Sequence, residues 1–287
     1  MKLSVIVPVY NRLEHLRALF FCLLKQKVQP YELIITDDGS SQKLEDFIGD
    51  LIPKANFKIK HIYQEDKGFR KTRALNNGVR ESEGDVLVFC DQDLIFPEDY
   101  LEKIELNSKK GNFLMGRAEY TTSEEKDIII RKLEQGIDYK TILEFINPQY
   151  KLNLLTLYKK DKRRRILKAL HLNKRGIKLV GMSYALYKED YIKVNGNDEK
   201  YQGWGCEDDD LGIRLEISGV SGKELITDLI QLHLYHPFDP TKKKSANEEY
   251  YYSRKKEIFE TKNGFCEFGY NNSIDKDKII CKILKGD

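Results

Sequence analysis

The chain has 287 residues, of which 40% are hydrophobic and 33% are charged, with a formal net charge of +3. These values predict an ordinary globular core in one large domain or two small ones, and no run approaches the ~18 apolar residues of a membrane-spanning helix. The five cysteines form no Cys-x-x-Cys pair, which argues against disulfides and structural zinc and favours a cytoplasmic protein. The N-terminus meets Pro8 at once and lacks a small-residue cleavage site, so we expect a strand there and no signal peptide.

The first part of the chain alternates between short apolar strands and helices. Residues 3–9 predict a buried strand, the leucines of 12–26 recur at helical spacing, and 31–36 predict a second strand. This order is typical of a βαβ unit with a right-handed crossover. A helix at 44–52 and a strand at 57–63 extend the pattern. We therefore expect an α/β fold with a mostly parallel, Rossmann-like sheet flanked by helices.

Two carboxylates follow the next strand. The stretch 85–93, "DVLVFCDQD", is an apolar run that ends in Asp91 and Asp93. Ligands bind at the carboxyl ends of strands in open α/β sheets, and hard divalent cations prefer oxygen ligands. Asp38 follows the strand 31–36 in the same way and could accept hydrogen bonds from a ribose or a base. Polar turns without a ligand remain the alternative at both places.

A basic cluster begins the helix that we expect after Gly68. Cations are unfavourable at a helix N-terminus unless an anion is nearby, and a diphosphate would be such an anion. A solvated basic surface is the alternative. The cluster consists of Lys67, Arg70, Lys71 and Arg73.

Four stretches in order resemble one family. "SVIVPVYNR", "ITDDGSS", "GFRKTRALNNGV" and "GDVLVFCDQDLIFPEDYL" are similar to the nucleotide-sugar half of family 2 glycosyltransferases of the GT-A fold, over residues 1–105. The resemblance implies a UDP-sugar donor and a divalent metal. It implies these positions: Pro8, Tyr10 and Asn11 along the nucleoside, Asp38 at uracil or ribose, Arg70 and Arg73 facing the nucleotide, Gln92 beside the donor, and Asp91 with Asp93 at the metal, Asp93 being the more direct ligand.

The middle of the chain combines a predicted strand at 111–120 with helical spacing at 128–133 and 152–172. Residues 158–178 contain ten Lys or Arg and a single acid, Asp161. A basic amphipathic helix of this kind can lie on the anionic inner face of a membrane. The alternative is a solvated helix whose leucines join the core. The balanced charge elsewhere and the lack of a nucleic-acid-binding motif argue against nucleic acid.

An acidic cluster precedes the predicted helix at 211–217, after a predicted strand at 180–187. Four acids in a row, residues 207–210, exceed what capping of a helix needs, because like charges raise each other's pKa. Arg214 lies four residues after Asp210 and can offset part of this charge. Trp204 lies between two glycines, and its aromatic face suits the apolar side of a sugar ring.

The stretch "GWGCEDDDLGIRL" resembles the Gly-Trp-Gly-x-Glu-Asp-Asp-Asp element of β-1,4-galactosyltransferases and bacterial chondroitin-type polymerases. That resemblance implies that Asp208 is the catalytic base and that Glu207 supports it or holds the acceptor, with Trp204 and Gly205. It also implies a late metal-binding His after a predicted strand at 225–234. His236 is the best match and His233 is the competitor; either one with the two aspartates favours Mn²⁺ over Mg²⁺.

These observations lead to one expectation for the whole chain. Residues 1–105 would be the donor half and 106–240 the acceptor half of one GT-A domain, and 241–287 a charged, helical C-terminal extension appended to the core. The expected activity is an inverting, metal-dependent transfer of a sugar from a UDP-sugar to a glycan or lipid-linked glycan of a bacterial surface polysaccharide. A sugar-nucleotide pyrophosphorylase and a non-catalytic, metal-dependent sugar-binding protein are the alternatives.

Overall fold

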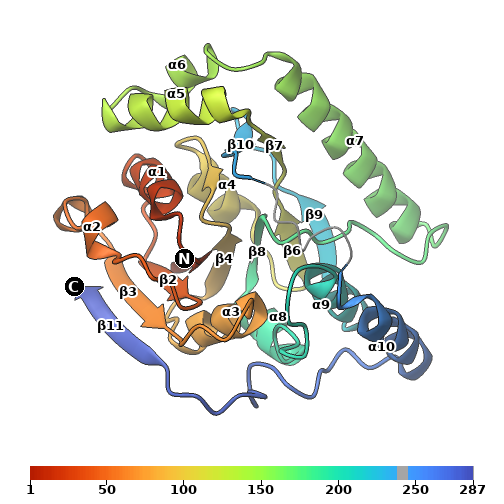
Figure 1. The fold of residues 1–287 in the computed structure, drawn as a ribbon. Coiled ribbons are helices and arrows are strands. Elements are labelled where there is room, and N and C mark those ends of the chain that lie inside the picture. Colours follow the sequence, from red (N-terminus) through yellow and green to blue (C-terminus); the bar gives the residue numbers. More distant parts are fainter. Residues whose placement is uncertain (238–244, 287) are drawn as a thin grey trace.

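A mixed sheet runs through the centre of the computed structural model, which describes residues 1–237 and 245–286 (Figure 1). Within these residues the sheet has eight strands in the order β11-β3-β2-β1-β4-β8-β6-β9. Their bounds are β1 Leu3–Val9, β2 Glu32–Asp37, β3 Lys58–Tyr63, β4 Val86–Cys90, β6 Asn112–Met115, β8 Ser183–Tyr187, β9 Ser221–Glu224 and β11 Ile280–Lys285.

The predicted parallel core is confirmed. Strand β1 pairs in parallel with β2 and β4, and β2 pairs in parallel with β3. Strand β8 then runs antiparallel to both β4 and β6. The carboxyl ends of β1, β2 and β4 therefore lie at one edge of the sheet, where Tyr10, Asp38 and Asp91 follow them.

Helices cover both faces of the sheet, because successive side chains of a strand point to opposite faces. Val5 and Val7 of β1 belong to one apolar cluster, and Ile6 belongs to the other. Helices α1 (Leu13–Leu24), α2 (Glu45–Ile48), α4 (Tyr100–Asn107), α5 (Ser123–Glu134) and α6 (Tyr139–Leu143) contribute to the first cluster. Helices α3 (Lys71–Arg80), α8 (Lys188–Lys193) and α9 (Glu207–Ile217) contribute to the second.

A smaller sheet brings distant segments together beside β4. It contains β5 (Leu94–Ile95), β10 (Gln231–His233) and β7 (Ala118–Tyr120), in that order. The prediction of a single strand at 111–120 is wrong, because this segment forms β6 in the large sheet and then β7 in the smaller sheet. A Cβ at Gly116 would lie 2.2 Å from the Ser183 hydroxyl, so the chain approaches β8 closely there. Of the strand predicted at 225–234, only β10 forms.

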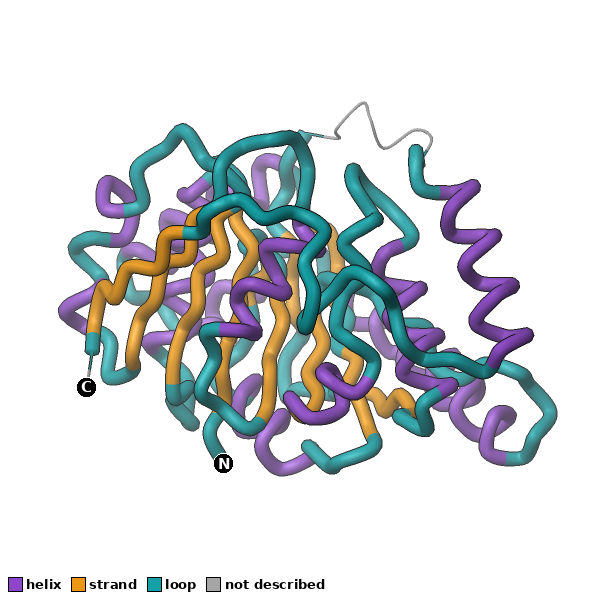
Figure 2. The backbone as a smooth tube through the Cα atoms, turned by 90° about the horizontal axis from the view of Figure 1, so that it is seen from below, coloured by secondary structure: helices purple, strands orange, loops and turns teal. Residues whose placement is uncertain are grey.

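The last segment is more than the appended extension that its composition predicted. Helix α10 (Glu248–Thr261) packs against α9, and β11 pairs antiparallel with β3 at the edge of the large sheet. Figure 2 shows this strand at the outer edge of the sheet, next to the C-terminus. Helix α7 (Gln149–Ala169) has 21 residues, yet no helix in the described ranges is both long and apolar enough to span a bilayer.

Candidate active site

A cavity of about 470 Å³ opens at the carboxyl ends of β1 and β4. It is lined from both halves of the chain, so residues predicted for the donor and for the acceptor face one space. The predicted residues that line it are Pro8, Tyr10, Asp38, Asp91, Gln92, Asp93, Trp204, Glu207, Asp208, His233 and His236. Asn11, Arg70, Arg73 and Gly205 are not among the residues that line this cavity.

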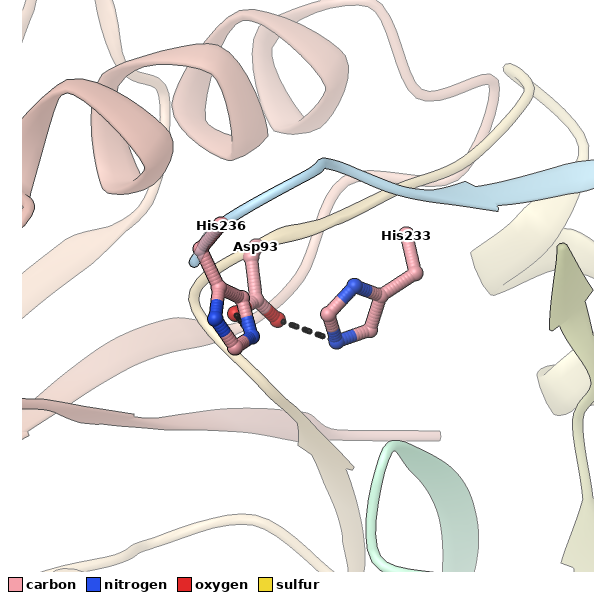
Figure 3. A group of neighbouring side chains, drawn as sticks. All are labelled: Asp93, His233 and His236. Carbon is pink, nitrogen blue, oxygen red and sulfur yellow. Dashed lines mark ion pairs between the residues drawn. The ribbon is translucent and has the colours of Figure 1, made fainter. Parts of the chain in front are cut away.

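Asp93 and two histidines converge on one side of the cavity (Figure 3). The Nε2 atom of His233 lies 3.1 Å from one oxygen of Asp93, and Nε2 of His236 lies 3.5 Å from the other oxygen. The three ligand atoms lie within 4.8 Å of one another. His233 and His236, treated in the sequence as competitors, both point at this carboxylate. Asp91 does not belong to this group.

The residues present fit a divalent cation. The Nδ1 atoms of His233 and His236 face the backbone oxygens of Leu234 and Pro237, at 3.2 and 2.9 Å. Carbonyl oxygens accept hydrogen bonds, so they favour the ring proton on Nδ1 and leave the Nε2 lone pairs facing the carboxylate. A lone pair that faces a carboxylate is unfavourable, so either a proton or a metal ion between each Nε2 and Asp93 satisfies this arrangement. Two imidazoles and a carboxylate favour Mn²⁺ over Mg²⁺.

Lys71 is the cation of the α3 N-terminus that lines the cavity. Its ammonium group lies 2.5 Å from Asp91. Burial lowers the pKa of Lys71, but the charges of Asp91, Asp208 and Glu207 outweigh this and raise its pKa overall. The two arginines predicted to face the nucleotide have other partners: Arg70 contacts Asp275 and Asp277, and Arg73 binds Gln64 and the backbone oxygen of Asp277. Of the basic cluster predicted from the sequence, Lys71 lines the cavity, whereas the two arginines that the resemblance assigned to the nucleotide do not.

Gln92 and Asp38 line the cavity near the carboxyl ends of β1, β2 and β4. The Gln92 amide accepts a hydrogen bond from the backbone N–H of Tyr10 and donates one to the backbone oxygen of Asn11, so it ties the end of β4 to the end of β1. Asp38 accepts hydrogen bonds from the backbone N–H of Arg70 and from Gln64. Burial raises the pKa of Asp38 to about 6, although these hydrogen bonds oppose the shift. Asn11 accepts hydrogen bonds from Ser41 beside the cavity.

The four acids of the α9 N-terminus divide into two pairs. Asp209 pairs with Arg175 at 2.8 Å, and Asp210 accepts a hydrogen bond of 2.6 Å from Arg214, the partner that its spacing predicted. These two carboxylates turn into the body of the protein. Glu207 and Asp208 line the cavity instead. Four acids can lie in a row because arginines neutralise the charges of Asp209 and Asp210, while Glu207 and Asp208 face the cavity.

Asp208 is held in place by the backbone. The N–H of Gly181 donates a hydrogen bond of 2.8 Å to its carboxylate, and a Cβ at position 181 would lie only 2.4 Å from the same group. Burial raises the pKa of Asp208, Lys71 lowers it, Asp91 raises it, and the net shift is upward. Burial and the charge of Asp208 raise the pKa of Glu207 to about 7. Both groups thus bind a proton more readily than ordinary carboxylates.

Trp204 is 43% exposed at the cavity, on a turn that requires its flanking glycines. Gly203 and Gly205 have φ values of +81° and +105°, which side chains with a Cβ rarely adopt. Other aromatic side chains of the lining were not singled out in the sequence, because the strands and loops that carry them are far apart along the chain. They are Phe69, Tyr120 and Tyr235.

Comparison with known proteins identifies the family of the chain. The profile of glycosyl transferase family 2 matches residues 4–172, and a profile described as the N-terminal domain of galactosyltransferase matches residues 162–237. The chain is 24% identical over 232 residues to chondroitin synthase of Escherichia coli, a match that covers 76% of this chain and 32% of that enzyme. The chain spans about half of the length of two other curated relatives that it matches.

Solved structures of glycosyltransferases share the fold. Staphylococcus aureus TarS in complex with UDP-GlcNAc superposes with a TM-score of 0.59 at 16% identity, covering 90% of this chain and 65% of TarS. The mannosyltransferase PcManGT of Pyrobaculum calidifontis, in complex with GDP-Man and Mn²⁺, gives 0.53 at 16% identity, covering 81% and 56%. The architecture is therefore the GT-A fold. The family 2 profile covers more than half of the chain, and the protein is thus a glycosyltransferase that belongs to glycosyl transferase family 2.

Proposed function

We propose that this glycosyltransferase moves a sugar from a UDP-sugar to a hydroxyl group of a glycan acceptor, with inversion at the anomeric carbon and with the help of a divalent metal. One observation carries the proposal. A carboxylate held by a backbone N–H, Asp208, shares a single cavity with the cluster of Asp93, His233 and His236. A proton acceptor and a cation site around one space are what such a transfer needs.

Asp208 is the proposed general base. Its raised pKa makes it a better proton acceptor than an ordinary aspartate, and the Gly181 N–H fixes the direction of its carboxylate. Glu207 lies beside it, buried, with one carboxylate oxygen that has no hydrogen-bond partner among the described residues. We assign that oxygen to a hydroxyl of the acceptor, and the exposed face of Trp204 to the apolar side of the acceptor sugar.

The donor side stabilises the departing diphosphate. A metal bound by Asp93 and the two histidines would supply positive charge there as a Lewis acid. Lys71 contributes a second positive charge, which Asp91 holds toward the cavity at 2.5 Å. Direct displacement needs one base on the acceptor side and no nucleophile on the donor side. Asp208 meets the first condition, and the pairing of Asp91 with Lys71 makes Asp91 a poor nucleophile.

The acceptor is proposed to be a growing glycan of a bacterial surface polysaccharide, in line with the similarity to chondroitin synthase. A panel of UDP-sugars and GDP-sugars, each tested for binding and slow hydrolysis with Mn²⁺, identifies the donor. The panel also tests the choice of uridine, which rests on the sequence resemblance. Tighter binding of a GDP-sugar would contradict that choice.

The proposal is tested by Asp208→Asn. We expect nucleotide release in the presence of acceptor to fall by roughly a hundredfold or more, because the amide cannot accept the proton, while donor binding is unchanged. Asp127→Asn, at an exposed carboxylate on α5, is the control and keeps full rate. Full activity of Asp208→Asn would show that another group is the base.

A further inference from the structure

We propose that the outer face of helix α7 docks this protein on an anionic phospholipid surface. This face consists of Leu152, Leu155, Lys159, Lys162, Arg163 and Ile166, together with Leu170 directly after the helix, all of which are exposed. Helix α7 lies at the outer edge of the molecule, beside β7 and β9 (Figure 1). The inference does not depend on the proposed reaction, because no residue of the outer face lines the cavity.

The apolar side chains of α7 do not all join the core. Its buried residues are Tyr150, Leu154 and Asp161, which share one side of the helix. At about 100° per residue, the outer face forms an arc of roughly 100° on the opposite side. Leu152 and Ile166 on that arc are 56% and 45% exposed. A solvated helix with its leucines in the core, the alternative left open by the sequence, does not describe this face.

The polar part of the outer face has one sign of charge. Lys159, Lys162 and Arg163 have no ion pair among the described residues. Asp161 is the single acid of residues 158–178, and it is buried and paired with Arg117 at 2.7 Å. Cations interleaved with exposed leucines match a bilayer interface, where apolar side chains enter the acyl boundary and cations meet anionic headgroups.

Other occupants fit this face less well. A two-fold contact between copies of the chain would bring the same cations together, and like charges repel. Single-stranded nucleic acid binds to basic grooves with exposed aromatic rings for base stacking, and the outer face has leucine and isoleucine in their place. Leucines that would remain in water on a nucleic acid become buried in a lipid interface, so the membrane is favoured.

Vesicle flotation tests the inference with the full chain. We expect the protein to float with vesicles of equimolar phosphatidylcholine and phosphatidylglycerol and to stay in solution with phosphatidylcholine alone. Each basic residue near such a surface changes partitioning by about fivefold. The affinity of the triple variant Lys159→Glu, Lys162→Glu, Arg163→Glu for anionic vesicles should therefore fall by roughly a hundredfold or more. Leu155→Ser with Ile166→Ser tests the apolar part and also weakens flotation.

The matched control reverses the charge of three exposed lysines elsewhere, with Lys54→Glu, Lys109→Glu and Lys278→Glu. It changes the net charge by the same amount as the α7 variant. It should float like the wild type. Equal flotation of the wild type and the α7 charge variant, or equal binding of the wild type to neutral and anionic vesicles, would overturn the inference. A dimer in light scattering that the α7 variants dissociate would also overturn it, in favour of a self-association surface. Circular dichroism confirms that each variant is folded.

Discussion

At the scale of single residues, the cavity contains opposed charges that control each other's protonation. Lys71 pairs with Asp91, and the charges of Glu207 and Asp208 also act on it. Its charge lowers the pKa of Asp208, while burial and Asp91 raise it. The protonation of the proposed base therefore depends on Lys71, which is also the cation proposed to contact the donor diphosphate. Substitution of Lys71 should consequently change both donor binding and the pH profile.

Removing this cation by Lys71→Met is expected to weaken donor binding by roughly ten- to a hundredfold, since a charge-assisted contact with the diphosphate is lost. A base must be deprotonated to act, so activity falls as the pH drops through the pKa of Asp208. Without Lys71 that pKa rises, and the acidic limb of the kcat profile moves to higher pH. The ammonium group of Lys67 pairs with Asp277 outside the cavity, so the control Lys67→Met should leave donor binding and the acidic limb unchanged. An unmoved acidic limb would contradict the coupling.

The cluster of Asp93, His233 and His236 leads to a second prediction at this scale. The double variant His233→Ala, His236→Ala should lower the affinity for Mn²⁺ by at least about a hundredfold, because only one of the three converging ligands remains. Calorimetric titration of Mn²⁺ into the protein measures this without turnover. His171→Ala, at an exposed histidine away from the cavity, is the control. Unchanged affinity in the double variant would place the metal elsewhere.

At the scale of elements, the site depends on strand ends and one helix start. The carboxyl ends of β1 and β4 present Tyr10 and Asp91, and the first turn of α9 presents Asp208. The segment that precedes β8 connects the two sides, because Gly181 lies against the Asp208 carboxylate. Gly181 has no side chain, and this makes room for the carboxylate of Asp208.

The variant Gly181→Ala tests this packing. The added Cβ would lie 2.4 Å from an oxygen of Asp208, so the carboxylate must move. A shift of about 1 Å in a catalytic group can cost up to a hundredfold in rate, and we expect kcat to fall by ten- to a hundredfold. Donor affinity, measured by calorimetry, should stay within about twofold. Gly286→Ala, where a Cβ meets nothing within 4 Å, is the control. An unchanged kcat would show that Asp208 is not positioned by this contact.

At the scale of the whole molecule, the end of the chain returns to its beginning. Strand β11 pairs with β3, and the segment before it places Asp275 and Asp277 against Arg70 at the start of α3. The side chains of Ile280 and Ile283 stay exposed, so β11 contributes backbone hydrogen bonds more than apolar burial. Its main effect is to cover the edge of β3, which would otherwise be open to other chains.

Deletion of residues 279–287 is expected to lower the free energy of unfolding by about 1 to 3 kcal/mol, since several backbone hydrogen bonds of about 1 kcal/mol each are lost. Self-association should rise as well, because the edge of β3 becomes exposed. Urea denaturation and light scattering measure the two effects. Deletion of 286–287 leaves β11 intact and should match the full chain. Equal stability and an unaltered monomer content after the longer deletion would refute this role of β11.

Local pattern was enough to predict the parallel core and the acids that end its strands, because apolar runs and helical spacing are properties of neighbouring residues. It also predicted Arg214 as the partner of Asp210, four residues away on one helix. Contacts between distant segments could not be predicted in this way. They include the pairing of β11 with β3 and the separation of β6 from β7.

The same limit applies to the site. The motifs identified Asp93 and Asp208, but three-dimensional packing determined that Lys71 faces the cavity while Arg70 is bound to the C-terminal segment. It also brought both His233 and His236 to Asp93. Side-chain direction at a helix start, and the meeting of residues more than a hundred positions apart, depend on how the elements pack. No local pattern encodes that packing.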